Sequence, residues 1–291
     1  MLENLERLIG SLQRGDLSRR EFIHRAIVLT GSLAAAAAFA DAVAPTASHA
    51  NLVDPNDASI VSSDIKFNAT DGVTIGGYLS RPKGEGKFPA VVVIHENRGL
   101  VDHIQDVARR LAKAGYVAIA PDLLSRQGGT ASFPSASAAT EGIRKLDDET
   151  STKDFDGAVN YLKAQTFVQT NKIGLTGFCW GGGNVLLFAT RNKDIAASVV
   201  FYGRNPKNID DIQNIAGPML GLYGGEDKGI TGAVPNLEAA MKKYGKSFEY
   251  KIYPGAPHAF HNDMNPERYR PDAAQDAWSK TLDFFKKHLQ S

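Results

Sequence analysis

The chain has 291 residues, 43% of them hydrophobic and 22% charged, which is typical of a globular protein with a substantial buried core. Its 33 basic and 32 acidic side chains leave a formal net charge of +1. This balance gives no electrostatic footprint for nucleic acid and no general attraction to an anionic membrane. Evidence of function therefore has to come from local motifs.

An arginine pair precedes an apolar run near the start of the chain. Arg19 and Arg20 stand ahead of residues 26–40, which are mostly small and aliphatic, and further small residues follow up to Ala50. These are the parts of a secretory signal, and paired arginines are typical of the twin-arginine export route. We therefore expect residues 1–50 to be a leader handled by the twin-arginine machinery.

Cleavage after Ala50 would leave a periplasmic or secreted mature chain. An amphipathic or buried N-terminal helix is the alternative interpretation of the same residues. A stable membrane anchor is disfavoured, because the uninterrupted apolar stretch is shorter than the ~20 residues that a span requires.

Short strand-like runs alternate with helical patterns along the rest of the chain. The predicted strands are residues 65–69, 73–81, 89–95, 116–120, 172–176, 196–202, 218–223 and 248–253. The predicted helices are residues 103–114, 152–164, 234–244 and 273–289, with a further helix after Cys179. We expect residues 125–150 to form a long loop with one weak helix and to supply part of a pocket wall.

This alternation predicts a single α/β domain over residues 51–291, with a mostly parallel sheet and helices on both faces. The first two strands are expected to pair antiparallel through a turn at Asp71-Gly72. Neither an internal repeat nor a linker to a second domain is visible in the sequence.

The most specific motif surrounds the one cysteine of the chain, Cys179. It stands in Gly177-Phe178-Cys179-Trp180-Gly181, directly after a predicted strand and before a helix. Gly-x-nucleophile-x-Gly in that context is the nucleophile elbow, here with a thiol in place of the usual hydroxyl. The dipole of the following helix favours thiolate over thiol. The alternative is a glycine-rich turn with a packed, inert cysteine.

A thiol nucleophile needs a base and an acid that orients the base. Asp227 follows the predicted strand at 218–223, and His258 follows the strand at 248–253. The order nucleophile, acid, histidine is that of α/β-hydrolases. Glu226 and His261 are the rival candidates for the acid and the base.

With these motifs, the sequence resembles the dienelactone hydrolase family, the carboxymethylenebutenolidases of the α/β-hydrolase superfamily. The resemblance covers residues 62–290. It is carried by the elbow, by the Asp227 and His258 segments, and by the segments His95-Glu96-Asn97-Arg98-Gly99 and Asp122-Leu123-Leu124-Ser125-Arg126-Gln127.

The resemblance implies that Glu96 contacts the resting thiol and accepts its proton when substrate enters. The alternative for Glu96 is a structural ion pair with Arg98 or Arg126. The backbone N–H groups of Trp180 and Asn97 are expected to form the oxyanion hole.

The resemblance also implies that Arg126 binds a substrate carboxylate, and we expect Tyr202 and Phe260 to contact the substrate. One departure stands out, because the family carries a second carboxylate-binding arginine where this chain has Asn262. The departure puts dienelactone itself in doubt as the substrate. Arg98, Arg204 or Arg268 could replace the missing charge.

The function that follows is a hydrolase that opens a lactone or cleaves a small ester through Cys179, His258 and Asp227. We expect no cofactor and no metal, and we interpret His95 as a packed, hydrogen-bonded imidazole rather than a metal ligand. A general carboxylesterase or thioesterase on the same site is one alternative. An inactive binding protein on a hydrolase fold is another, whereas a thiol redox protein is disfavoured because no resolving cysteine exists.

Overall fold

A single eight-stranded sheet organises the part of the chain that follows the expected leader. The structure is a computed structural model, and it describes residues 25–28 and 53–290. The contacts between Cα atoms divide the chain into two units, Met1–Leu52 and Val53–Ser291. In the first unit only one helical stretch, Arg25–Val28, is described. The arginine pair and the expected cleavage position lie outside the described residues.

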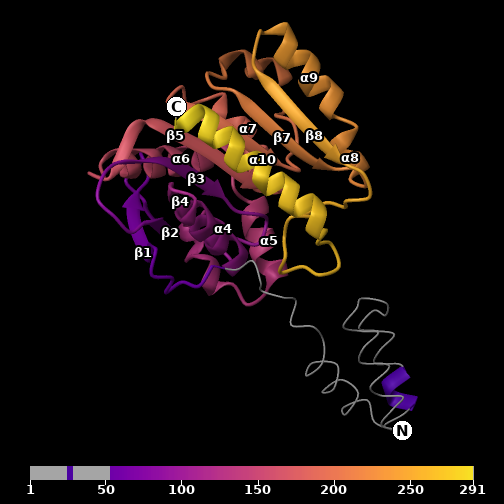
Figure 1. Ribbon diagram of the computed structural model, residues 1–291, viewed down its shortest axis with the longest axis horizontal. Coiled ribbons are helices and arrows are strands. Elements are labelled where there is room, and N and C mark those ends of the chain that lie inside the picture. Colours follow the sequence, from indigo (N-terminus) through magenta and orange to yellow (C-terminus); the bar gives the residue numbers. More distant parts are fainter. Residues whose placement is uncertain (1–24, 29–52, 291) are drawn as a thin grey trace. The chain divides into compact units, whose positions relative to one another are not determined.

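The strands of the sheet run in the order β1-β2-β4-β3-β5-β6-β7-β8 (Figure 1). The pairs β1–β2 and β2–β4 are antiparallel, and all the others are parallel. The strands are β1 (Ile60–Asn68), β2 (Thr74–Pro82), β3 (Phe88–Ile94), β4 (Val117–Pro121), β5 (Val168–Phe178), β6 (Ile195–Phe201), β7 (Met219–Gly224) and β8 (Phe248–Tyr253). This mostly parallel sheet confirms the predicted α/β fold class.

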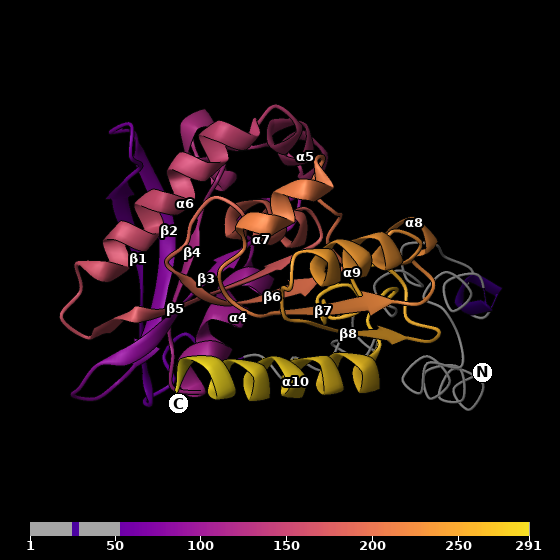
Figure 2. The same ribbon diagram turned by 90° about the horizontal axis from the view of Figure 1, so that it is seen from above.

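Helices cover the sheet on both faces (Figure 2). The first face is covered by α6 (Asp148–Lys163), α7 (Trp180–Ala189) and α9 (Val234–Lys243). The opposite face is covered by α4 (Asp102–Lys113) and α10 (Pro271–Leu289). No helix among the described residues combines the length and the apolar character needed to cross a membrane.

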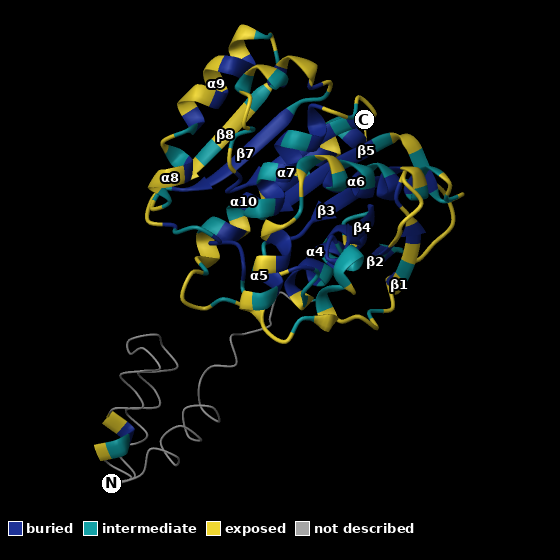
Figure 3. Cartoon of the chain, turned by 180° about the vertical axis from the view of Figure 1, so that it is seen from behind, coloured by how far each residue is buried: buried dark blue, intermediate teal, exposed yellow. Residues whose placement is uncertain are grey.

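The central strand β3 shows why the core has two layers. Its side chains alternate, so that Ala90, Val92 and Ile94 pack with one helical layer while Val91 and Val93 pack with the other. All five are fully buried, and the central strands form the dark interior in Figure 3. A β-branched run without polar interruption is what a strand covered on both faces requires.

Every predicted strand and helix is present, with boundaries that differ by a few residues. The largest difference is β1, which begins at Ile60, because the polar residues 62–64 interrupt its apolar pattern and the strand lies at the edge of the sheet. The segment at 125–150 contains the expected helix as α5 (Ala136–Arg144), together with two 3₁₀ turns, Ser125–Gln127 and Thr130–Ser132. The short helix α8 (Lys228–Thr231) and the 3₁₀ helix Ile209–Asn214 were not predicted.

Candidate active site

Cys179 occupies a strained turn between β5 and α7. Its φ of 58° and ψ of −115° are unusual for a residue with a side chain. The flanking glycines permit this turn, because a Cβ on Gly177 would lie 2.5 Å from the Gly181 carbonyl oxygen. A Cβ on Gly181 would lie 2.3 Å from the carbonyl oxygen of Ile94. The local geometry is therefore that of a nucleophile elbow.

His258 and Asp227 come together from the ends of neighbouring strands. Asp227 follows β7, His258 follows β8, and the His258 Nδ1 is hydrogen-bonded to the Asp227 Oδ2. This bond leaves Nε2 as the ring nitrogen available to a second partner. Of the rival candidates, Glu226 is exposed and His261 is buried among aromatic rings.

Two pockets meet at the Cys179 side chain, and both are also lined by His258, Asn97 and Thr140. The smaller pocket has a volume of about 460 Å³ and includes Glu96. The larger pocket has a volume of about 820 Å³ and includes Asp227. Helix α5 supplies wall residues to both, as expected for the segment at 125–150. The thiol and the imidazole thus face the same two spaces.

The resting Cys179 side chain is a neutral thiol. Burial raises its pKa to about 11, and the negative charges of Glu96 and Asp227 act in the same direction. The Trp180 N–H and the Arg204 guanidinium lower this pKa, but by less than burial raises it. The helix dipole favours the thiolate but does not ionise Cys179 by itself, so ionisation requires a base in the pocket.

Glu96 is a buried carboxylate at the end of β3, held on one side only. Its Oε2 accepts a hydrogen bond of 2.9 Å from the Asn262 Nδ2, and the Asn262 Oδ1 in turn accepts one from the N–H of Met264. Its Oε1 is buried and has no hydrogen-bond partner in the described part of the chain. Neither Arg98 nor Arg126 forms an ion pair with Glu96. The structure therefore does not support the alternative interpretation, in which Glu96 is a partner in a structural ion pair.

His95 holds the segment that carries Glu96. Its Nδ1 donates to the Glu96 carbonyl oxygen at 2.7 Å, and its Nε2 accepts from the Leu123 N–H at 3.2 Å. The ring is fully buried, it stacks on Trp180, and burial lowers its pKa, so the imidazole stays neutral. Within residues 25–28 and 53–290, no group of three or more His, Cys, Asp or Glu side chains is arranged to hold a metal ion.

Arg126 lies outside both pockets, in contrast to the substrate-binding position expected for it. Its guanidinium makes a hydrogen bond of 2.7 Å to the fully buried Asp154 and one of 2.8 Å to Asp71. A buried carboxylate without a cation strongly destabilises the folded state, and Asp154 therefore holds the Arg126 side chain in this position. The expectation of a substrate contact at Arg126 is corrected accordingly.

Tyr202 and Phe260 occupy different positions relative to the larger pocket. Tyr202 lines it with a positive φ of 41°, and its ring centre lies 5.0 Å from that of His258. Its buried hydroxyl has no hydrogen-bond partner among the described residues. Phe260 is fully buried behind Tyr202 and lines neither pocket, so the expected substrate contact of Phe260 is replaced by a packing role.

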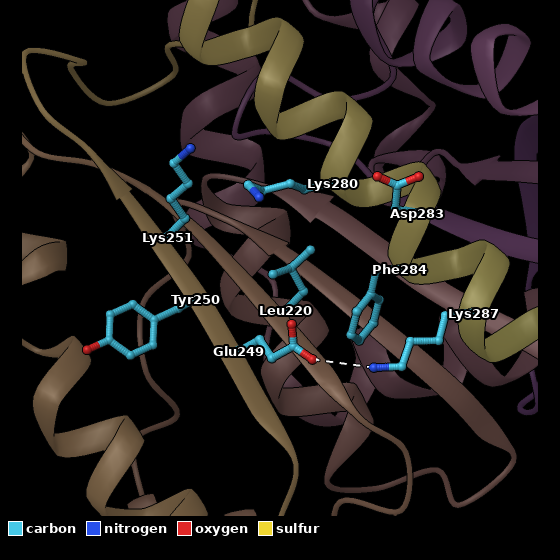
Figure 4. A pocket seen from close by; sticks show the side chains of 8 residues that line it. All are labelled: Leu220, Glu249, Tyr250, Lys251, Lys280, Asp283, Phe284 and Lys287. Carbon is cyan, nitrogen blue, oxygen red and sulfur yellow. Dashed lines mark ion pairs between the residues drawn. The ribbon is translucent and has the colours of Figure 1, made fainter.

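A separate groove between β8 and α10 contains none of the expected site residues (Figure 4). Its charged side chains face one another, as Lys287 and Glu249 do at 3.8 Å. Charges that pair across a surface groove contribute little to binding or stability. The chemistry indicated by the sequence lies at the two pockets that meet at Cys179.

Comparison with known proteins identifies the family. The family model described as "Dienelactone hydrolase family" matches residues 75–289, which span the whole sheet except β1. The chain belongs to the dienelactone hydrolase family. A family protein of Methylorubrum extorquens, named for carboxymethylenebutenolidase, is 37% identical over 94% of this chain and 96% of its own length.

Two further relatives of this dienelactone hydrolase family member agree with that assignment. A Bradyrhizobium protein named as a 2-oxo-3-(5-oxofuran-2-ylidene)propanoate lactonase is 36% identical over 76% of this chain and 92% of its own length. The crystal structure of a Klebsiella pneumoniae protein titled as a dienelactone hydrolase superposes with a TM-score of 0.73. It has 30% identity and covers 79% of this chain and 99% of the Klebsiella chain. This family member is accordingly a hydrolase of the α/β-hydrolase fold.

Sequence reasoning missed two features of the site in this dienelactone hydrolase family member. The contact between Asn262 and Glu96 joins residues far apart in the chain, and only the departure at Asn262 pointed to it. His95 was predicted to be a packed, hydrogen-bonded imidazole, but its partners, the Glu96 carbonyl oxygen and the Leu123 N–H, were not identified. A histidine directly before a site glutamate was the available signal.

Proposed function

We propose that this hydrolase opens lactones or cleaves small carboxylic esters by acyl transfer to Cys179, with His258 and Asp227 completing a catalytic triad. The observation that carries the proposal is the strained Cys179 on the same two pockets as His258, whose Nδ1 is engaged by Asp227. The lactonase name of the Bradyrhizobium relative supports a lactone as one substrate class.

The first step of the proposed mechanism is removal of the thiol proton. Burial keeps Cys179 protonated before substrate binds, and the Glu96 Oε1 is a buried acceptor without a partner in the described chain. Entry of the substrate lets Glu96 take this proton, so that a thiolate forms only when a carbonyl carbon is present to receive it.

Attack then forms the bond between Sγ and the acyl carbon and places a negative charge on the carbonyl oxygen. The N–H groups of Trp180 and Asn97 stabilise this oxyanion. On collapse the C–O bond to the leaving oxygen breaks, and that oxygen takes the proton held by Glu96. The product of this step is a thioester on Cys179.

Hydrolysis of the thioester completes the cycle. The Nε2 of His258 removes a proton from water, and the new hydroxyl bonds to the acyl carbon as the bond to Sγ breaks. The proton on His258 then returns to Sγ. Asp227 fixes the ring through Nδ1 and stabilises the transient imidazolium charge.

The test is an activity screen across enol-lactones, saturated lactones and short-chain esters, with Cys179→Ala as the blank. One equivalent of iodoacetamide should abolish hydrolysis, and Glu96→Gln should lower turnover about 10²-fold, in the range of one general acid–base group. Full activity after complete labelling of Cys179 would refute the thiol mechanism. A general carboxylesterase would prefer the open esters of the panel.

We further propose that residues 1–50 direct export by the twin-arginine route and are removed after Ala50, which places residues 51–291 in the periplasm or outside the cell. The support is the arginine pair ahead of the apolar run. Replacing Arg19 and Arg20 by Lys should hold the protein in the cytoplasm, as measured by fractionation. Normal export of that variant would contradict the proposal.

A further inference from the structure

The larger pocket presents a cation, Arg204, that has no ion-pair partner among the residues that the structure describes. Its lining contains five charged side chains, and four of them are engaged with other protein groups. Arg144 pairs with Glu141, Lys207 pairs with Asp148 at 3.0 Å, and Asp227 pairs with His258. Arg204 is exposed and makes no ion pair or side-chain hydrogen bond with any residue in the described part of the chain.

Arg204 is anchored beside the elbow rather than on a remote rim. It follows β6, and its backbone lies against the first turn of α7. A Cβ placed on Gly183 would lie 3.4 Å from the Arg204 carbonyl oxygen and 4.0 Å from the Arg204 Cβ. The guanidinium is close enough to the thiol to lower the pKa of Cys179. A cation in this position lies within reach of a molecule bonded to Sγ.

The rest of the larger pocket is suited to a hydrocarbon segment. Trp180, Leu187 and Pro206 are partly buried in its wall, and Ile143 and Ile230 are almost fully buried there. Apolar walls with one charged group are typical of a site that takes an apolar body and fixes its polar end. The charge of Arg204 selects an anion for that end.

The smaller pocket offers a different environment. Arg98 and Arg268 line it and are exposed, but its buried end is the Glu96 carboxylate, which would repel a second carboxylate. Arg204 acts more strongly on the pKa of the Cys179 thiol than either of these arginines. The anion-binding position next to the reacting atoms is therefore in the larger pocket.

We propose that the larger pocket is the subsite for one arm of the ester substrate, an apolar arm that ends in an anionic group held by Arg204. This inference rests on the proposed function of Cys179. It narrows the substrate class to esters or lactones with an aliphatic or aromatic segment that bears a terminal carboxylate. The group that selects the anion, Arg204, follows β6 and lies against α7. It does not belong to the segments around Arg126 and Asn262.

The test compares two matched pairs of esters on the full chain. In the first pair, ethyl pentanoate and the monoethyl glutarate anion differ only at the end of the acyl arm. In the second, butyl acetate and 4-acetoxybutanoate differ only at the end of the alcohol arm. Acid release is titrated at constant pH, and the selectivity is kcat/KM for the anionic ester divided by kcat/KM for the neutral one.

We expect the wild-type chain to prefer the anionic ester in at least one pair. Arg204→Gln should lower that selectivity about tenfold, the size of one charge-assisted hydrogen bond at a partly solvated site. Arg204→Lys should retain part of it. Arg98→Gln and Arg268→Gln are the matched controls, because they remove the same charge from the smaller pocket, and each should change the selectivity by about twofold at most.

Unchanged selectivity in Arg204→Gln would overturn the inference, and so would an equal loss in Arg98→Gln or Arg268→Gln. Hydrolysis of neutral esters without anion preference would overturn this inference alone, whereas failure to hydrolyse any ester would count against the proposed function.

A binding measurement separates failure of the subsite inference from failure of the proposed function, because it needs no turnover. Pentanoate should slow iodoacetamide labelling of Cys179 more than pentanamide does in the wild-type chain but not in Arg204→Gln. Equal protection by the two ligands in the wild-type chain would contradict the subsite.

Discussion

The two pockets that meet at Cys179 share a thiol but differ in what their polar groups contact. In the smaller pocket, the Glu96 carboxylate is buried, one of its oxygens is held by Asn262, and the other has no partner in the described chain. The larger pocket contains Asp227, which pairs with His258, and an exposed cation, Arg204, that makes no ion pair with any described residue, beside an apolar wall. A buried acceptor suits proton transfer, whereas a solvated cation suits binding.

This contrast suggests a division of labour. Changes around Glu96 should act on kcat, because they affect the formation of the thiolate. Changes around Arg204 should act on kcat/KM for charged substrates, because they affect binding of one arm. Changes at the Asp227–His258 pair should affect every substrate alike.

The largest effect is expected at Asp227. Asp227→Asn should lower kcat about 10³- to 10⁴-fold for neutral and anionic esters alike, because it removes the charge that orients and stabilises the His258 ring. Glu226→Gln is the matched control, since it changes the adjacent exposed carboxylate, and steady-state rates close to wild type are expected for it. An equal loss of kcat in the two variants would contradict the assignment of Asp227 as the acid of the triad.

The next largest effect is a pH dependence of the free thiol. Because the pKa of Cys179 is raised to about 11, its thiolate fraction grows about tenfold for each pH unit between neutral pH and pH 10. The rate of iodoacetamide labelling in the absence of substrate should follow this rise. A labelling rate that reaches its plateau below pH 8 would show that the resting site already holds a thiolate.

A smaller effect is expected at Asn262, which positions Glu96 and does not act directly in our mechanism. Asn262→Leu removes the hydrogen bond to the Glu96 Oε2, and kcat for neutral esters should fall about tenfold while KM stays nearly constant. The loss should vanish when Glu96→Gln is already present, because the two residues act as one unit. Additive losses in the double variant would mean that Asn262 acts independently of Glu96.

The smallest effect on catalysis is expected at Arg126, which lies outside both pockets. Arg126→Met leaves the fully buried Asp154 without a cation and should lower the free energy of unfolding by about 3 kcal/mol, while the folded enzyme keeps its kcat/KM. Asp71→Asn, which changes the more exposed partner, should lower the free energy of unfolding by less than Arg126→Met does. Urea unfolding and steady-state kinetics measure both. If Arg126→Met folds stably and its KM for anionic esters rises, this result would support the substrate contact first expected for Arg126.

The architecture was largely predictable from the sequence, because the apolar alternation in the chain dictates which segments must be buried. Residues 89–95 show this most clearly, since a β-branched run has no stable position except between two helical layers. The first half of β1 carried no such signal, because the polar residues 62–64 interrupt it, and its extent depends on pairing with β2 at the edge of the sheet.

The site was predictable where its residues follow strand ends. Cys179 stands directly after β5, Asp227 and His258 lie in the loops that follow β7 and β8, and the parallel sheet brings these strand ends to one edge. Arg126 and Phe260 could not be placed in this way. Their side chains are fixed by Asp154 and Tyr202, which are distant in the sequence, and no local pattern reveals such contacts.

Direct detection of a covalent intermediate tests the central claim most sharply. The chain is mixed with a slowly hydrolysed ester, the reaction is quenched in acid within one turnover, and the protein and its peptides are weighed by mass spectrometry. The account predicts that the mass of the acyl group is added to the peptide that contains Cys179 and is absent in Cys179→Ala. Rapid hydrolysis with no adduct on that peptide, and with Cys179→Ala equally active, would contradict it.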